Sequence, residues 1–192
     1  MRSVSVGIYV FDQVEVLDFA GPFEIFSLAG ELMATGGTAP FRVFTLSENV
    51  GMVTARNGLR IISDFGLDSA FEPDILIIPG GPGIQQQYEN NAVVEWIGQR
   101  AGKAEVTASV CNGAFMLAKA GLLSGKQATT HWEAIDVLKR MYPDIVVRGD
   151  RRFVDQVDIV TAAGVSSGID LSLHLVWSRS ACTSEANGSN GC

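Results

Sequence analysis

The stretch Thr107–Gly121, TASVCNGAFMLAKAG, joins a segment typical of a β-strand to a segment typical of a helix. Residues 105–111, EVTASVC, are rich in β-branched side chains, which favour a strand. The following NGA tolerates a tight turn, and an alanine-rich helix is expected over residues 113–120, ended by Gly121. A strand that runs directly into a helix is typical of a parallel α/β sheet. Cys111 stands at the junction between the two.

Apolar stretches elsewhere extend the same pattern along the chain. The run ILII at residues 75–78 has no polar alternation, which predicts a parallel strand covered by helices on both faces. Alternating strands and helices predict a helix–sheet–helix sandwich around a mostly parallel sheet. Strands are expected at residues 4–11, 41–46, 59–63, 74–78, 105–111, 128–131, 145–148 and 153–162, the last as an added hairpin. Helices are expected at residues 21–34, 91–101, 113–120, 132–141 and 166–177.

The length of 192 residues and the 47% hydrophobic content predict one domain, over residues 1–177. Residues 178–192, SRSACTSEANGSNGC, are polar and lack hydrophobic periodicity, so a disordered or altered tail is expected there. No apolar run approaches the roughly 20 residues that a membrane span needs. The first apolar stretch is too short for a signal peptide, and a cytoplasmic protein is expected.

Charge and cysteine content exclude several partner classes. The formal net charge of −7 disfavours nucleic acid, because phosphate binding needs a basic surface. Three cysteines are too few for a disulfide framework or a zinc cluster. The dinucleotide and phosphate-loop signatures are absent. No metal or other cofactor is therefore expected, and the expected partner is a small molecule.

Cys111 has two interpretations. At the end of a strand, the tight turn into a helix projects one side chain, as in the nucleophile elbow of hydrolases. The helix N-terminus should then lower the pKa of the thiol below its ordinary value of about 8.5 and favour the reactive thiolate. Alternatively, Cys111 is a small residue of the core that ends a strand.

Three further segments offer residues for a site beside Cys111. The turn PGGPG at residues 79–83 includes Gly81 and can direct backbone amides at an anion, or it is a plain glycine turn. Asp18, flanked by apolar residues, either caps the helix that begins near Pro22 or takes part in chemistry. His131 is a candidate base, or a hydrogen-bonded histidine of the core.

Together these segments resemble the ThiJ/PfpI superfamily, which has a flavodoxin-like, class I glutamine amidotransferase-like fold. The resemblance covers roughly residues 3–176 and is carried by LDFAGP at 17–22, PGGPG at 79–83 and SVCNGA at 109–114. It implies a homodimer, a cysteine nucleophile at Cys111 and an acidic partner at Asp18. It also implies intermediate-binding backbone amides near Gly81 and Asn112, and His131 stays a candidate for a supporting residue.

Within that superfamily the segments resemble the branch that holds the isocyanide hydratases and the amidase-like sensor domains of AraC-type regulators. The resemblance implies a lyase that adds water to an isocyanide and releases an N-substituted formamide. One alternative is a non-catalytic sensor domain, as in AraC-type regulators. Another is a glyoxalase or a redox-sensing member. A protease is disfavoured, because the protease-like members carry a histidine where this chain has Asn112.

Overall fold

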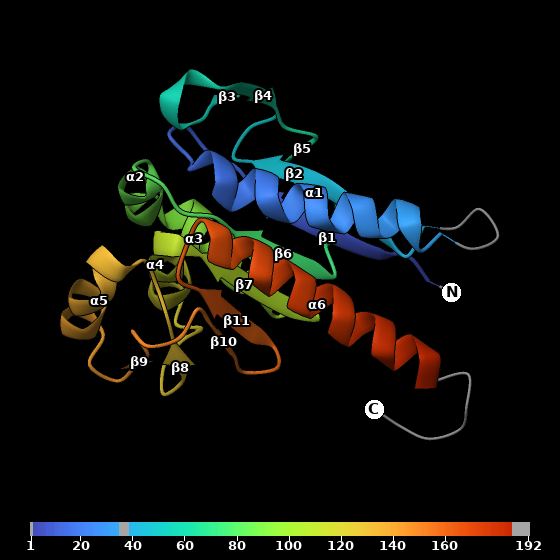
Figure 1. The fold of residues 1–192 in the computed structure, drawn as a ribbon. Coiled ribbons are helices and arrows are strands. Elements are labelled where there is room, and N and C mark those ends of the chain that lie inside the picture. Colours follow the sequence, from blue (N-terminus) through green and yellow to red (C-terminus); the bar gives the residue numbers. More distant parts are fainter. Residues whose placement is uncertain (1, 35–38, 186–192) are drawn as a thin grey trace.

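A computed structural model describes residues 2–34 and 39–185 as a seven-stranded sheet with helices on both faces (Figure 1). The strand order is β10-β11-β7-β6-β1-β2-β5, and every pair is parallel except β10 with β11. The strands are β1 (Val4–Tyr9), β2 (Phe41–Ser47), β5 (Phe65–Gly66), β6 (Ile75–Ile78), β7 (Val106–Val110), β10 (Phe153–Asp155) and β11 (Ile159–Ala162). The predicted mostly parallel sheet and its added hairpin are confirmed.

Helices cover the two faces of this sheet. α1 (Val16–Leu32) and α6 (Ser166–Glu185) lie side by side on one face (Figure 1). α2 (Ile84–Glu89), α3 (Asn91–Ala101) and α4 (Ala114–Lys119) pack together on the other. Every residue of β6 is buried, as the unbroken apolar run ILII predicts. The predicted helix–sheet–helix sandwich is therefore confirmed.

Two small sheets stand apart from the main one. β3 (Met52–Thr54) and β4 (Arg60–Ile62) form an antiparallel hairpin, so the strand expected at 59–63 does not join the central sheet. β8 (Gln127–Ala128) pairs with β9 (Val146–Val147), and α5 (Ile135–Met141) lies between them in sequence. The strand expected at 128–131 is shorter than predicted: β8 ends at Ala128, and the backbone N–H of Thr129 donates to the side chain of Thr161 rather than to the backbone of a neighbouring strand.

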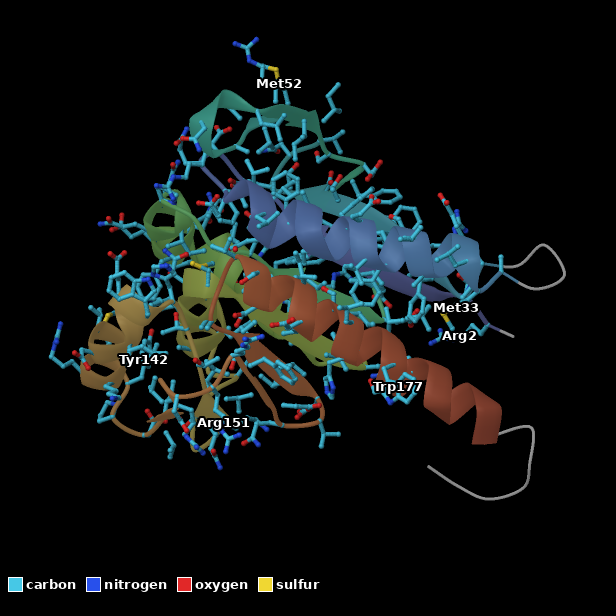
Figure 2. All side chains as sticks on the ribbon, in the orientation of Figure 1. Arg2, Met33, Met52, Tyr142, Arg151 and Trp177 are labelled. Atoms are coloured by element: carbon cyan, nitrogen blue, oxygen red, sulfur yellow. The ribbon has the colours of Figure 1, made fainter. Side chains whose placement is uncertain are left out.

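Two helix boundaries differ from the prediction. α1 begins at Val16 rather than near residue 21, so Pro22 lies inside the helix and Asp18 in its first turn. α6 continues to Glu185, past Trp177, whose side chain is exposed (Figure 2). The expected loss of regular structure after Trp177 is therefore wrong for residues 178–185, while residues 186–192 lie outside the described part of the chain. Among the described helices, none is long and apolar enough to cross a membrane.

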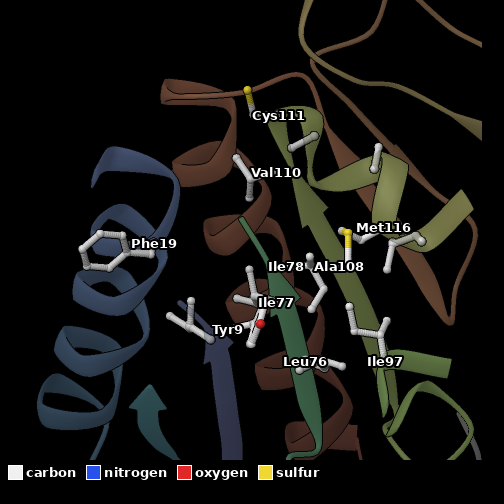
Figure 3. Close-up of a cluster of buried hydrophobic side chains, with 14 of the residues drawn as sticks. Tyr9, Phe19, Leu76, Ile77, Ile78, Ile97, Ala108, Val110, Cys111 and Met116 are labelled. Atoms are coloured by element: carbon white, nitrogen blue, oxygen red, sulfur yellow. The ribbon is translucent and has the colours of Figure 1, made fainter. Parts of the chain in front are cut away.

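The core lies between the sheet and its helices and reaches up to Cys111. Figure 3 shows side chains of the central strands, including Ile77, Ala108 and Val110, stacked toward the end of β7. Cys111 closes this cluster, and its sulfur points away from Ala108 and Val110. The cysteine thus has its backbone in the core and its sulfur at the carboxyl edge of the sheet, where parallel α/β sheets bind ligands.

Candidate active site

The backbone at Cys111 is strained. Its φ is +58°, a left-handed conformation that costs a non-glycine residue roughly 1–2 kcal/mol. A short 3-10 turn (Cys111–Gly113) links β7 to α4, and the segment that follows β6 presses closely against it. A Cβ at Gly80 would lie 2.2 Å from Asn112 Oδ1 and 2.9 Å from Cys111 Cβ, so only glycine fits there. The geometry is that of the predicted nucleophile elbow.

Asp18 lies beside this elbow and is completely buried. Its Oδ2 accepts the Gly80 N–H at 3.1 Å, and its Oδ1 accepts the Val165 N–H at 2.9 Å. Those amides belong to segments 62 and 147 residues further along the chain. The N-cap of α1 is Glu15, so the capping interpretation of Asp18 is wrong. The carboxyl group instead joins the loops that follow three strands, and it hydrogen-bonds the thiol of Cys111.

Burial decides the protonation of this pair. Desolvation raises the pKa of Asp18 to about 6, although the two backbone N–H groups favour its charged form. Desolvation, together with the charge of Asp18, raises the pKa of Cys111 to about 12. The expected lowering of the thiol pKa is therefore wrong, because the six residues of α4 make a short helix and the Asn112 backbone opposes these effects only in part. At neutral pH the site holds a neutral thiol that donates to a carboxylate.

The side chain of Asn112 closes over the glycine turn. Gly81 N–H donates to Asn112 Oδ1 at 2.7 Å, and Asn112 Nδ2 donates back to the Gly81 oxygen at 3.2 Å. The amide of Gly81 is therefore engaged and is not free to bind an intermediate, contrary to the expectation from the glycine motif. The backbone N–H of Asn112 instead faces the sulfur, where it lowers the pKa of Cys111 against the effect of burial.

The two histidines have different places. His131 lines the same pocket as Cys111, and its Nδ1 lies 3.7 Å from Glu133 Oε2. The bond from Thr130 Oγ1 to the Cys111 oxygen, at 2.9 Å, holds this loop against the elbow. His174 pairs with Asp155 at 2.7 Å, and its ring lies tilted against the ring of Phe153 with the centroids 4.9 Å apart, so it joins α6 to β10.

A pocket of about 720 Å³ opens over the sulfur, between α2 and α5. The sequence pointed to Gly81, Cys111, Asn112 and His131 among its lining residues, but not to Arg56 or Val165. Arg56 Nη1 pairs with Glu15 Oε2 at 2.7 Å. Val165 has a φ of +46° and follows Gly164 at the carboxyl end of β11, so a glycine just past a predicted strand was the available signal. Among the described residues, no cluster of acids, histidines and cysteines could hold a metal ion.

The raised pKa of Asp18 predicts a specific pH dependence of stability. Because the folded state binds this proton more tightly than the unfolded chain, its contribution is present below pH 4 and is lost as the pH rises through about 6. A shift from 3.8 to about 6 corresponds to about 3 kcal/mol. Urea unfolding should show wild type losing about that free energy relative to Asp18→Asn between pH 4 and pH 7. A difference that does not vary with pH would contradict the assignment.

Similarity to known proteins extends over most of this chain. The DJ-1/PfpI family matches residues 4–178. Isonitrile hydratase of Pseudomonas putida is 29% identical over 177 residues, which cover 90% of this chain and 71% of that protein. The transcriptional regulator GbdR of Pseudomonas aeruginosa is 30% identical over 172 residues, which cover 90% of this chain but only 46% of the regulator.

Solved structures agree with these sequence similarities. The crystal structure of a THiJ/PfpI family protein from Pseudomonas syringae has a TM-score of 0.78 and 23% identity, and the match covers 100% of this chain and 78% of that one. The fold, the elbow and the sequence match agree with the resemblance stated from the sequence. The chain is a member of the DJ-1/PfpI family.

Proposed function

We propose that the protein hydrates isocyanides, R–N≡C, to N-substituted formamides, with Cys111 as the nucleophile and Asp18 as the proton shuttle. The observation that carries this proposal is the strained Cys111, hydrogen-bonded to a buried carboxyl group and open to a pocket. The similarity to an isonitrile hydratase supports the same reaction class. A homodimer, which the family resemblance implies, stays a prediction.

The first step joins the sulfur to the substrate. The sulfur of Cys111 attacks the terminal carbon of R–N≡C while the S–H bond breaks and Asp18 takes the proton. The same carboxyl group then gives that proton to the attacked carbon, which forms the thioimidate R–N=CH–S–Cys111. A thiol with a pKa of about 12 is almost entirely protonated at neutral pH, so a base in direct contact is needed for this attack.

The second step adds water and releases the product. Asp18 accepts a proton from water as the oxygen bonds to the thioimidate carbon and passes that proton to the substrate nitrogen, which gives R–NH–CH(OH)–S–Cys111. The C–S bond then breaks while the new hydroxyl group gives up its proton, Asp18 carries that proton to the departing sulfur, and R–NH–CHO leaves. The Asn112 N–H, which faces the sulfur, can stabilise the charge that develops there. The sum of both steps is the addition of one water to one isocyanide, which gives one N-substituted formamide.

A small-molecule sensor is the second candidate function. The similarity to the regulator GbdR covers the same part of this chain, and a pocket above a thiol that is protonated at neutral pH could bind a small molecule without catalysis. A redox sensor is disfavoured, because peroxide reacts with accessible thiolates and the buried thiol of Cys111 is neutral.

The test is turnover of isocyanides as a function of pH, with formamide measured by chromatography. Because Asp18 must be a carboxylate to accept the thiol proton, kcat/KM should fall about tenfold per pH unit below an apparent pKa of about 6, which belongs to the Asp18–Cys111 pair. Methylglyoxal serves as the second substrate. Consumption of methylglyoxal alone would replace the proposal with a glyoxalase, and binding without any turnover would replace it with a sensor.

A further inference from the structure

The pocket above Cys111 is much larger than a small isocyanide requires. Its volume of about 720 Å³ lies in the range that holds drug-sized ligands, whereas methyl isocyanide has three heavy atoms. The wall on the α2 side includes Ile84 and Tyr88, which are four residues apart and share one helix face. Phe115, the second residue of α4, lines the pocket beside the elbow.

The opposite wall consists of exposed apolar side chains. Val137 and Met141 line the pocket from α5 and remain 37% and 47% exposed. They are four residues apart, so they form a continuous apolar surface along about 6 Å of helix. Burying such surface against an apolar ligand removes it from water, which favours binding. The wall therefore suits an extended apolar group.

The two walls are held at a fixed separation. The hydroxyl groups of Tyr88 on α2 and Tyr142 at the end of α5 hydrogen-bond at 2.7 Å (Figure 2 shows Tyr142 beside α5). The ammonium group of Lys119 lies 4.8 Å from the centre of the Tyr88 ring, and this cation–π contact adds a tie to α4. A pocket braced in this way is largely formed before a ligand binds.

The charges around the pocket disfavour an anionic ligand. Three carboxylates line it, from Glu15, Glu89 and Glu133. The guanidinium of Arg56 is already paired with Glu15 at 2.7 Å, and His131 lies beside Glu133. A substrate that carried a carboxylate would meet like charges with no free cation among these lining groups.

We propose that this pocket selects neutral substrates with an extended apolar group, which lies along Phe115, Val137 and Met141 while the reactive carbon meets Cys111. The proposal rests on the proposed function for the identity of the reactive group. It names the substrate class as large, uncharged and apolar, and it excludes small or anionic isocyanides as preferred substrates.

Binding of the unreactive products tests the selectivity independently of turnover. The wild-type chain is titrated with N-(4-phenylbutyl)formamide, N-methylformamide and a carboxylated N-(4-phenylbutyl)formamide, and Kd is measured by calorimetry or thermal shift. The neutral phenylbutyl compound should bind at least about tenfold more tightly than either of the others. Equal affinities, or tighter binding of the carboxylated compound, would overturn the proposal.

Variants of the apolar wall on α5 show whether that wall determines the affinity for the phenylbutyl compound. Turnover assays then separate the proposed selectivity from the proposed hydration activity. Val137→Ser and Met141→Ser should each weaken the phenylbutyl compound at least about threefold, whereas Val146→Ser, at an exposed position of β9 outside the pocket, should leave Kd unchanged. Loss of affinity in Val146→Ser equal to that in the wall variants would refute the assigned wall. The three parent isocyanides are assayed alongside. If the three formamides bind in the expected order but none of the isocyanides is hydrated, only the proposed function is refuted. If the isocyanides are hydrated but the three formamides bind with equal affinity, only the proposed selectivity is refuted.

Discussion

Replacing Cys111 with alanine is expected to reduce isocyanide hydration by at least about 10⁴-fold while the fold persists. The sulfur forms the covalent bond of the proposed first step, and removal of a nucleophile leaves only binding and general polarisation of the substrate. Alanine keeps the Cβ atom of residue 111, which packs closely against Gly164. A Cβ placed on Gly164 would lie only 3.1 Å from that atom. The measurement is formamide production at saturating isocyanide, with circular dichroism as the check on folding.

Two further variants of cysteine sharpen this result. Cys182→Ala removes a different thiol and should leave turnover unchanged. Cys111→Gly should be as inactive as Cys111→Ala but more stable by about 1 kcal/mol, because glycine adopts a φ of +58° without strain. Turnover that survives in Cys111→Ala would make this cysteine a residue of the core. Equal stability of the alanine and glycine variants would show that the elbow stores no strain.

Replacing Asp18 with asparagine is expected to lower kcat at least about 100-fold. Asparagine keeps the shape of the side chain but cannot take the thiol proton or return it to the substrate carbon. Its amide group offers one oxygen, so one of the two N–H groups from Gly80 and Val165 loses its acceptor. That loss costs about 1–3 kcal/mol and is offset near pH 8 by relief of a buried charge. Single-turnover kinetics with melting curves at pH 8 measure both effects.

Asp74 supplies the matched control for this experiment. It also accepts a backbone N–H, from Ser5 at 2.8 Å. However, it precedes β6 and so lies at the amino ends of the strands, opposite the carboxyl ends where Cys111 lies. Asp74→Asn should lower the melting temperature without a specific change in kcat. If Asp18→Asn turns over like wild type, or if both variants lose rate in proportion to stability, Asp18 is not the proton shuttle.

The architecture and the position of the nucleophile could be predicted because they depend on local patterns. The run ILII requires a strand buried on both faces, and the small residues after Cys111 permit the sharp turn into a helix. Boundaries were predicted less well. Pro22 suggested a helix start at residue 21, but the helix begins five residues earlier, at Val16, and Pro22 lies inside it. α6 continues past Trp177 although its sequence there has little apolar periodicity.

The sequence by itself determined a parallel α/β sandwich with a cysteine elbow at residue 111, and the family resemblance implied Asp18 as an acidic partner of that cysteine. Only the tertiary structure decided how these groups behave. The thiol is neutral because burial and the charge of Asp18 outweigh the helix N-terminus, and desolvation depends on everything that surrounds the site. The Gly81 amide is engaged because the Asn112 side chain reaches it. The Val165 amide binds Asp18 across 147 residues of chain, and no local pattern records which distant loops meet.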